Sequence, residues 1–189
     1  FLLDGFMPAQ TALVSGSWGV GKTTALVPLM ASVAHLTPAR WGFHPLLRRH
    51  VLFVTEAPEQ VHDVLLSMLR KEEATASWDE FRRWFHVRRA RRLEPAKLGR
   101  LLKGLADQFT YTLPSGFRVR PAVVLDTISA NIALDNENDN SQAGAAMAAI
   151  KQALPGTPII LVGHTPKSLR RATIDDMTAR GASAFEADC

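Results

Sequence analysis

Eight consecutive residues near the start of the chain, Gly16 to Thr23, have the spacing of a phosphate-binding loop. They read GSWGVGKT, which matches the pattern G-x-x-x-x-G-K-[ST], and they lie between an apolar run and a stretch with helical spacing. Glycines let backbone N–H groups curl around an anion, and the following helix presents its positive end to the same charge. The nucleotide-binding residues predicted here are Gly16, Ser17, Trp18, Gly19, Val20, Gly21, Lys22, Thr23 and Thr24.

Several side chains of this loop have distinct predicted roles. Lys22 is expected to neutralise oxygens of the β- and γ-phosphates, and the Thr23 hydroxyl to complete the shell of a Mg²⁺ ion. Thr24 is expected to touch the α-phosphate. Trp18 is unusual in such a loop: it either stacks on a neighbouring group or packs the loop down, and we favour packing. The cofactors implied are ATP and Mg²⁺.

An acidic residue ends the apolar run Val123 to Leu125. A magnesium triphosphate site needs a carboxylate that holds the metal or its water, and we expect Asp126 to do this together with Thr23. Aspartates also commonly cap the turn after a strand, which is the alternative interpretation of Asp126.

A second acid, Glu56, follows the apolar run Val51 to Thr55. In a parallel sheet this position lies at the same edge as the phosphate-binding loop. Hydrolysis needs a group that activates water, and the residue after Asp126 is Thr127 rather than a glutamate. We therefore expect Glu56 to be the base. The alternative is an acid at the start of a helix, with Glu59 as its companion.

A histidine, His164, follows the apolar run Pro158 to Gly163 and reaches the same edge. Such a side chain can hydrogen-bond the terminal phosphate oxygens and respond when they leave, which predicts a γ-phosphate sensor. The alternative is a histidine that caps the end of a strand. The candidate catalytic residues are Lys22, Glu56, Asp126 and His164.

The scaffold that must hold these residues is predicted from apolar runs rich in β-branched residues, which alternate with stretches of helical spacing. The expected strands cover residues 11–15, 51–55, 122–126 and 158–163, with a further short strand over 84–88. The expected helices cover 21–35, 57–71, 94–109 and 140–154, and we expect loops over 37–49 and 131–141. Nearly continuous apolar strands favour a mostly parallel sheet covered on both faces, so the predicted fold class is α/β.

Composition limits the class of protein. The chain has 189 residues, 47% of them hydrophobic and 21% charged, which is enough for the core of one domain. No apolar run is long enough for a membrane span and no secretory signal is visible, so we expect a soluble cytoplasmic protein without a membrane partner. The single cysteine, Cys189, excludes an internal disulfide and a cysteine zinc cluster. Because the sequence begins at Phe1 rather than at a methionine, we expect a piece of a longer polypeptide.

The ordered motifs resemble those of the RecA-like P-loop ATPases. Within these, the resemblance is to the hexameric replicative helicases typified by the plasmid RepA helicase and to related AAA-type plasmid or phage proteins. The segments that carry it are SGSWGVGKTT, VLFVTEAPEQV, VVLDTISAN, NENDNSQAGAAM, IILVGHTPK and RGASAF. The resemblance implies a single RecA-like ATPase domain over residues 1–189, with Glu56 as the catalytic glutamate, Asp126 beside the metal and His164 as the γ-phosphate sensor. It also implies a homo-oligomeric ring, such as a hexamer, and single-stranded DNA in a channel faced by the loops after Asp126 and His164.

The resemblance also implies an arginine contributed by the neighbouring subunit of the ring. In RepA-like proteins this arginine comes soon after the RGxSA segment, which corresponds to a position at or past Cys189 in this sequence. Candidates for that role or for DNA contact are Lys167, Arg170, Arg171 and Arg180, and the alternative for them is a solvated basic loop.

Residues 82–103 hold nine Lys or Arg and one acid, Glu94, with Trp84, Phe85 and His86 among them. This basic segment either contacts nucleic-acid phosphates, forms a solvated helical face, or docks onto an acidic subunit or another domain. The expected function is an ATP-hydrolysing motor, a DNA helicase core of plasmid or phage replication type. The alternatives are an ATP-dependent regulator or loader without helicase activity, a RecA-like recombinase and a signalling ATPase.

Overall fold

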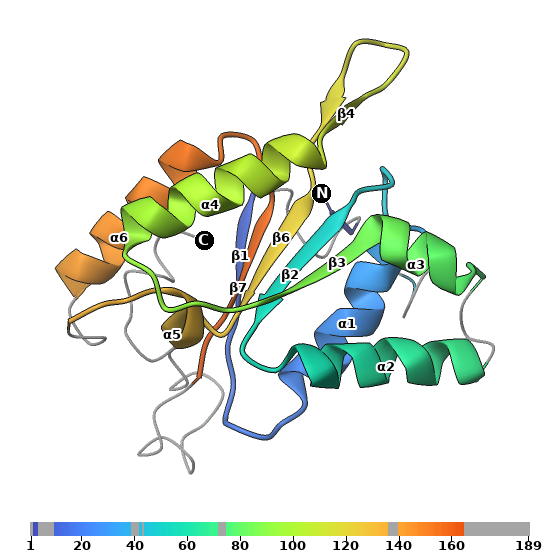
Figure 1. Cartoon of the computed structure of the whole chain (residues 1–189), viewed down its shortest axis with the longest axis horizontal. Coiled ribbons are helices and arrows are strands. Elements are labelled where there is room, and N and C mark those ends of the chain that lie inside the picture. The colour runs from blue at the N-terminus through green and yellow to red at the C-terminus, as the bar shows by residue number, and fades with distance from the viewer. Residues whose placement is uncertain are drawn as a thin grey trace.

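A five-stranded parallel sheet forms the centre of the protein (Figure 1). The structure, a computed structural model, describes residues 2–3, 10–38, 42, 44–71, 75–135 and 140–164. Across the sheet the strands are β1 (Thr11–Val14), β7 (Ile159–Val162), β6 (Ala122–Asp126), β2 (Val51–Thr55) and β3 (Phe85–Arg89). Every neighbouring pair is parallel, so the carboxyl ends of all five strands share one edge.

Helices cover both faces of this sheet (Figure 1). One face carries α1 (Lys22–Val33), α2 (Pro58–Arg70) and α3 (Trp78–Trp84), and the other carries α4 (Pro95–Gln108), α5 (Ile128–Asn131) and α6 (Asn140–Ala153). The predicted α/β fold with a mostly parallel sheet and helices on both faces is therefore confirmed. Among the helices of the described residues, none is long and apolar enough to cross a membrane.

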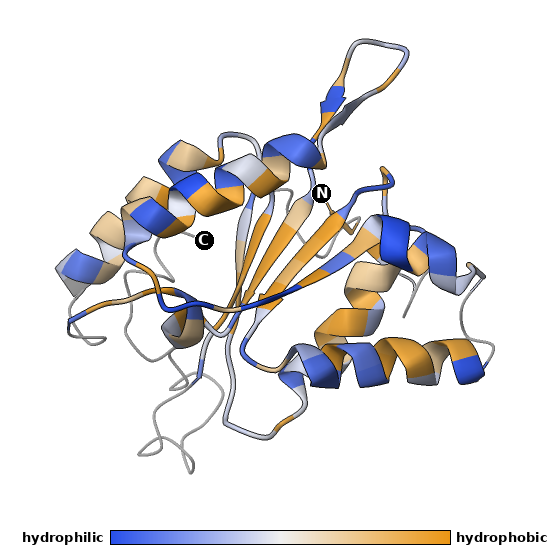
Figure 2. Cartoon of the chain, viewed as in Figure 1, coloured by the Kyte–Doolittle hydropathy of each residue, from blue (hydrophilic) through white to orange (hydrophobic). Residues whose placement is uncertain are grey.

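Alternate residues of the central strands enter two separate hydrophobic clusters. In β2, Val51 and Phe53 pack with α1 and α2, whereas Leu52 and Val54 pack with α4 and α6. All four are at least nine-tenths buried, and Figure 2 shows the strands as mostly hydrophobic ribbons. Because both faces are covered, these strands need no polar alternation, which explains the continuous apolar runs in the sequence.

The predicted strands and the four predicted helices agree with the structure to within two residues at each end. Three further features were missed: the short helices α3 and α5, and an antiparallel hairpin of β4 (Tyr111–Thr112) and β5 (Arg118–Val119), which projects from the body of the domain in Figure 1. The Ser77 hydroxyl accepts from the Glu80 amide, and the Glu80 carboxylate accepts from the Ser77 amide, both at 3.3 Å. This capping box sets the start of α3.

The expected loop over 131–141 is only partly described, because residues 136–139 lie outside the described part of the chain. At the start of this segment the structure differs from the prediction, because Asn131 closes the short helix α5, which was not expected. At its other end α6 begins at Asn140, as predicted for the helix over 140–154. The Thr127 hydroxyl accepts from the Ala130 amide, and this side-chain cap starts α5 directly after β6.

Candidate nucleotide-binding site

The loop between β1 and α1 has the backbone shape of an anion-binding turn. Gly19 and Gly21 have φ angles of 80° and 83°, which residues with a Cβ atom rarely adopt. Gly21 is the N-cap of α1, and no side chain caps this helix start. The first N–H groups of α1 therefore remain for an anion at the mouth of the loop.

The ammonium group of Lys22 is held by three acceptors. It donates to the carbonyl oxygens of Gly16 at 2.8 Å and Ser17 at 2.9 Å, and it lies 3.1 Å from Nδ1 of His164. Because a lysine ammonium has donors only, Nδ1 must be the acceptor in the last contact. This contact is a hydrogen bond in the tautomer of His164 that carries the ring proton on Nε2.

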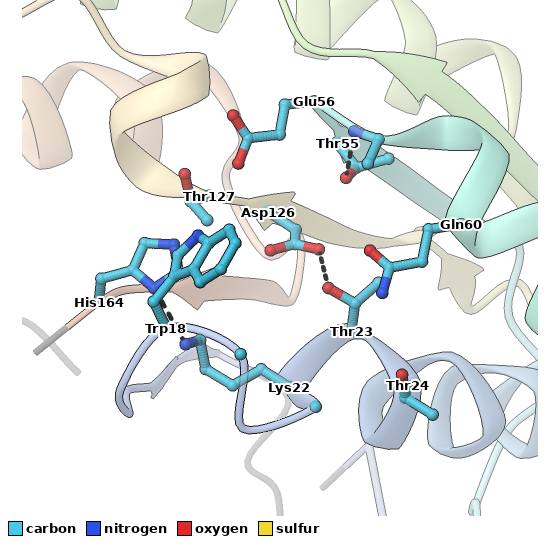
Figure 3. Close-up of a pocket in the computed structure, with 13 residues that line it drawn as sticks. Trp18, Lys22, Thr23, Thr24, Thr55, Glu56, Gln60, Asp126, Thr127 and His164 are labelled. Carbon is cyan, nitrogen blue, oxygen red and sulfur yellow. Dashed lines mark hydrogen bonds between the residues drawn. The ribbon is translucent and has the colours of Figure 1, made fainter.

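Thr23 and Asp126 form the closest polar contact between α1 and β6. The Thr23 hydroxyl donates to Oδ2 of Asp126 at 2.7 Å (Figure 3). The hydroxyl uses its single proton in this bond, so its lone pairs stay available to a cation. One carboxylate and one hydroxyl are hard oxygen donors of the kind that Mg²⁺ prefers.

Charge in this pocket is only partly compensated. Asp126 is 4% exposed, and burial raises its pKa above the ordinary value, against the opposing effects of the Thr23 hydrogen bond and the Lys22 charge. Burial also lowers the pKa of Lys22, while the charge of Asp126 opposes that shift. Both ionised forms thus lack the solvation that water would provide, and each gains from an added partner of opposite charge.

Glu56 lies where β2 passes into α2. Its amide donates to the Asp126 carbonyl at 3.1 Å, which ties the end of β2 to the end of β6. The helix itself has Ala57 as its N-cap and begins at Pro58, and the acid in its first turn is Glu59. Glu56 therefore precedes the helix, and its side chain lines the pocket (Figure 3).

A pocket of about 450 Å³ connects these elements at the carboxyl edge of the sheet. It is lined by Trp18, Gly19, Gly21, Lys22, Thr23, Thr24, Thr55, Glu56, Ala57, Gln60, Asp126, Thr127 and His164. In the view of Figure 3, Asp126 lies between Glu56 on one side and Lys22 on the other. The four candidate catalytic residues thus share one cavity, although β1, β2, β6 and β7 are far apart in sequence.

The structure corrects one expectation about the loop. The Trp18 side chain is 75% exposed, so the interpretation that it packs the loop down is wrong. Its indole instead contributes to the lining of the pocket. Gly16, Ser17 and Val20 do not line the cavity: the first two offer carbonyl groups to Lys22, and Val20 is 62% exposed.

Three polar residues of the pocket were missed by the sequence analysis. Thr55 ends β2 opposite Asp126 in the sheet register, and its hydroxyl accepts from the Ala57 amide at 3.2 Å. Thr127 follows Asp126, and the peptide bond between them is cis. Gln60 lies one helical turn after Glu56. Thr55 and Thr127 could have been found because each is adjacent in sequence to one of the two acids at the strand ends. Gln60 could have been found from its spacing of four residues after Glu56.

The candidates for a contact in a neighbouring subunit or with DNA, Lys167, Arg170, Arg171 and Arg180, lie outside the described residues. In the part of the chain that the structure describes, no group of three or more His, Cys, Asp or Glu side chains forms a metal site. The oxygen pair of Thr23 and Asp126 suits a magnesium ion that takes its remaining ligands from phosphates and water.

Comparisons with known proteins agree with this geometry at the level of the family. No curated protein matches the chain. A family model described as an AAA domain matches residues 1–169, which include the loop, both acids and His164. The chain therefore belongs to the AAA domain family, and its parallel sheet and phosphate-binding loop are those of a RecA-like P-loop ATPase domain.

Proposed function

We propose that this domain hydrolyses ATP with Mg²⁺ to drive movement along single-stranded DNA, as one subunit of a ring. The observation that carries the hydrolysis is that one cavity collects a lysine ammonium, an oxygen pair for a metal, and a carboxylate from a third strand. Movement on DNA and ring assembly rest on the resemblance of the ordered motifs to RepA-type helicases.

Each group has a definite part in this proposal. The amides at the start of α1 and the Lys22 ammonium bind the β- and γ-phosphates, and Thr23 with Asp126 holds the magnesium ion. The ion supplies charge neutralisation between the β- and γ-phosphates when it is bound. The partly compensated charges of Asp126 and Lys22 favour these partners, because both side chains lack full solvation.

Glu56 acts as the base in this proposal. In the view of Figure 3 it lies on the far side of Asp126 from Lys22. In this proposal its carboxylate activates the water that attacks the terminal phosphate. Asp126 is unsuited to the same role because its carboxylate already accepts from Thr23. Thr127, the neighbour of Asp126 in sequence, has no basic group. The position of Glu56 before α2, rather than inside its first turn, leaves its carboxylate for the cavity.

His164 senses the γ-phosphate in this proposal. A phosphate that takes the Lys22 ammonium competes with Nδ1 of His164 for the same donor. Binding therefore releases the imidazole, which can then hydrogen-bond the phosphate through Nε2–H. A histidine that changes its hydrogen bonds when the terminal phosphate leaves can report hydrolysis to the rest of the ring.

The test compares three variants of the full-length protein. Lys22→Ala is expected to lose ATP binding, whereas Glu56→Gln is expected to bind ATP normally and to release phosphate at least ~100-fold more slowly. Asp63→Asn makes the matched change on an exposed acid of α2 that does not line the pocket, and it should leave both properties unchanged. The measurements are equilibrium ATP binding and phosphate release with and without single-stranded DNA.

Two results decide between this proposal and its main alternative. Normal phosphate release by Glu56→Gln excludes Glu56 as the base. Tight ATP binding by the wild-type protein without any turnover, even with DNA, identifies an ATP-dependent binding module instead. A strand-displacement assay then separates a helicase from a DNA-stimulated ATPase that does not unwind.

A further inference from the structure

The carboxyl end of edge strand β3 carries three exposed arginines, Arg88, Arg89 and Arg91, which we call the arginine cluster. β3 pairs with β2, and the register places Arg89 opposite Thr55, the residue before Glu56. The cluster therefore lies at the same sheet edge as the nucleotide pocket. The other six basic residues of the segment are placed differently. Arg82 and Arg83 belong to α3, and Arg92 donates to the Leu134 carbonyl. Lys97, Arg100 and Lys103 lie on α4, where the two lysines are paired with Glu94 and Asp107.

Arg89 is bonded directly to the turn that carries Glu56. Its Nη1 donates to the Glu56 carbonyl at 3.2 Å, and its Nη2 donates to the carboxylate of Glu59 in the first turn of α2. The next amide along the chain, that of Ala90, donates to the Thr55 carbonyl at 2.7 Å. The guanidinium of Arg89 thus bridges the two sides of the turn that holds the proposed base.

The same guanidinium is open to an external anion. Its side chain is 60% exposed, and an ion pair this exposed contributes little to stability, because water solvates both partners well. A phosphate that forms two parallel hydrogen bonds with an arginine is a strong competitor for the Glu59 carboxylate. When a phosphate replaces the Glu59 carboxylate as the partner of Arg89, the hydrogen bonds that hold the Glu56 turn change.

The cluster also borders a small apolar groove of about 240 Å³. All three arginines line it, and its floor includes Leu98, Leu101 and Leu105 of α4. Leu101 is 45% exposed, so part of this floor faces solvent. A groove with cationic walls and an apolar floor suits a ligand with anionic groups and a flat apolar body. Its volume is below the roughly 300–1,000 Å³ of drug-sized sites, which suits a single base better than a helix.

We propose that the arginine cluster binds the phosphates of single-stranded nucleic acid, with a base over the leucine floor, and that Arg89 transmits this binding to Glu56. The coupling rests on the proposed function, because it requires that Glu56 is the base. The nucleic-acid binding site does not depend on that function. In this role Arg89 is a positioning residue: it touches the backbone of the Glu56 turn and acts through it.

Binding is tested first, with the full-length protein and a fluorescent oligothymidylate in an anisotropy titration at several salt concentrations. The double variant Arg88→Ala/Arg91→Ala removes two phosphate contacts, so the slope of log K against log salt should fall by about 1.4. The same loss corresponds to about 25-fold weaker binding at about 0.1 M salt. Arg100→Ala, an exposed arginine of α4 that does not line the groove, is the matched control and should bind as the wild type does.

Unchanged affinity and slope in the double variant overturn the binding site. A titration with poly-glutamate distinguishes the other kind of partner: tighter binding of this polyanion than of the oligonucleotide overturns the nucleic-acid assignment in favour of an acidic protein. If binding depends on the cluster but no variant or wild type releases phosphate, the site is supported and the proposed ATPase function fails.

Coupling is tested with Arg89→Ala and Arg89→Lys. Arg89→Ala should lower the DNA-stimulated kcat at least ~10-fold with little change in KM for ATP, since the base is displaced but the phosphate loop is intact. Arg89→Lys keeps the charge but not the two-pronged geometry, so it should bind DNA nearly as well and recover little of the stimulation. Equal stimulation ratios in the wild type and both variants overturn the coupling.

Discussion

Replacing Asp126 by Asn should stabilise the fold while it removes activity. The carboxylate is 4% exposed, and its raised pKa means that the folded environment disfavours the ionised form more than the unfolded chain does. Asparagine has nearly the same shape and can still accept the 2.7 Å hydrogen bond from Thr23. Removing one poorly solvated charge should therefore raise the free energy of unfolding by about 1 kcal/mol at neutral pH.

The pH dependence of this gain follows from the direction of the shift. Because the pKa of Asp126 is higher in the folded than in the unfolded protein, ionisation costs the wild type stability as pH rises above its ordinary value of 3.8 and through the folded value. The advantage of Asp126→Asn should be absent at low pH, appear within that window and then stay constant. At neutral pH it should correspond to a rise in Tm of about 2–4 °C for a chain of this size.

The assay is thermal unfolding between about pH 3 and 8, with magnesium-dependent ATP turnover measured on the same protein at neutral pH. Asp107→Asn is the control of opposite sign. Asp107 lies on the surface, and the hydrogen bond from Lys103 lowers its pKa, so its substitution should lower Tm slightly rather than raise it. A lower Tm for Asp126→Asn than for the wild type at neutral pH refutes the argument that burial of this charge is unfavourable.

Two other predictions concern stability. Gly21→Ala should lower the free energy of unfolding by about 1–2 kcal/mol, because the φ angle of 83° disfavours a residue with a Cβ atom although the added methyl has open space. Gly104→Ala inside α4, where the added methyl also has open space, should instead raise it by about 1 kcal/mol. Chemical unfolding of both variants checks this contrast. Burial, helped by the charges of His50 and Arg88, lowers the pKa of His86 to about 4, so stability should fall as pH drops from 6.5 towards 4. Allowing for solvent around the half-buried ring, this loss is about 1–2 kcal/mol, and urea titrations should show it reduced in His86→Phe.

The strands and helices were predicted well because each is encoded by a pattern within one short segment of the sequence. The central strands β7, β6 and β2 are short apolar runs, and the last two end at a polar residue, Asp126 and Thr55. Each of the four predicted helices has a clear start or a hydrophobic face. The order of the strands was not predicted, since it depends on contacts between segments such as β1 and β7, which are about 150 residues apart. The hairpin was missed because its strands have only two residues each.

The pocket was predicted at the level of strand ends rather than of contacts. Strand ends at one edge placed Glu56, Asp126 and His164 together correctly. Sequence could not show that Lys22 bonds to His164 across 142 positions, nor that Arg89 reaches the Glu56 carbonyl from the next strand. These contacts depend on the registers of strands that meet only after folding.

The pKa values of the histidine pair His50 and His86 and of Asp126 are all perturbed, but their surroundings give these shifts different meanings. His50 and His86 lie 3.1 Å apart, Nδ1 to Nε2, and their rings stack on Trp84 and Phe109, so their lowered pKa values reflect burial among aromatic side chains. Asp126 instead has its raised pKa in a polar cavity, next to helix amides without a side-chain cap. A buried charge that borders a cavity gains stabilisation when a ligand of opposite charge enters, whereas a buried imidazole packed between rings does not. The carboxyl edge of the sheet, and not the histidine pair, is therefore where this protein stores unfavourable electrostatic energy that a magnesium nucleotide can relieve.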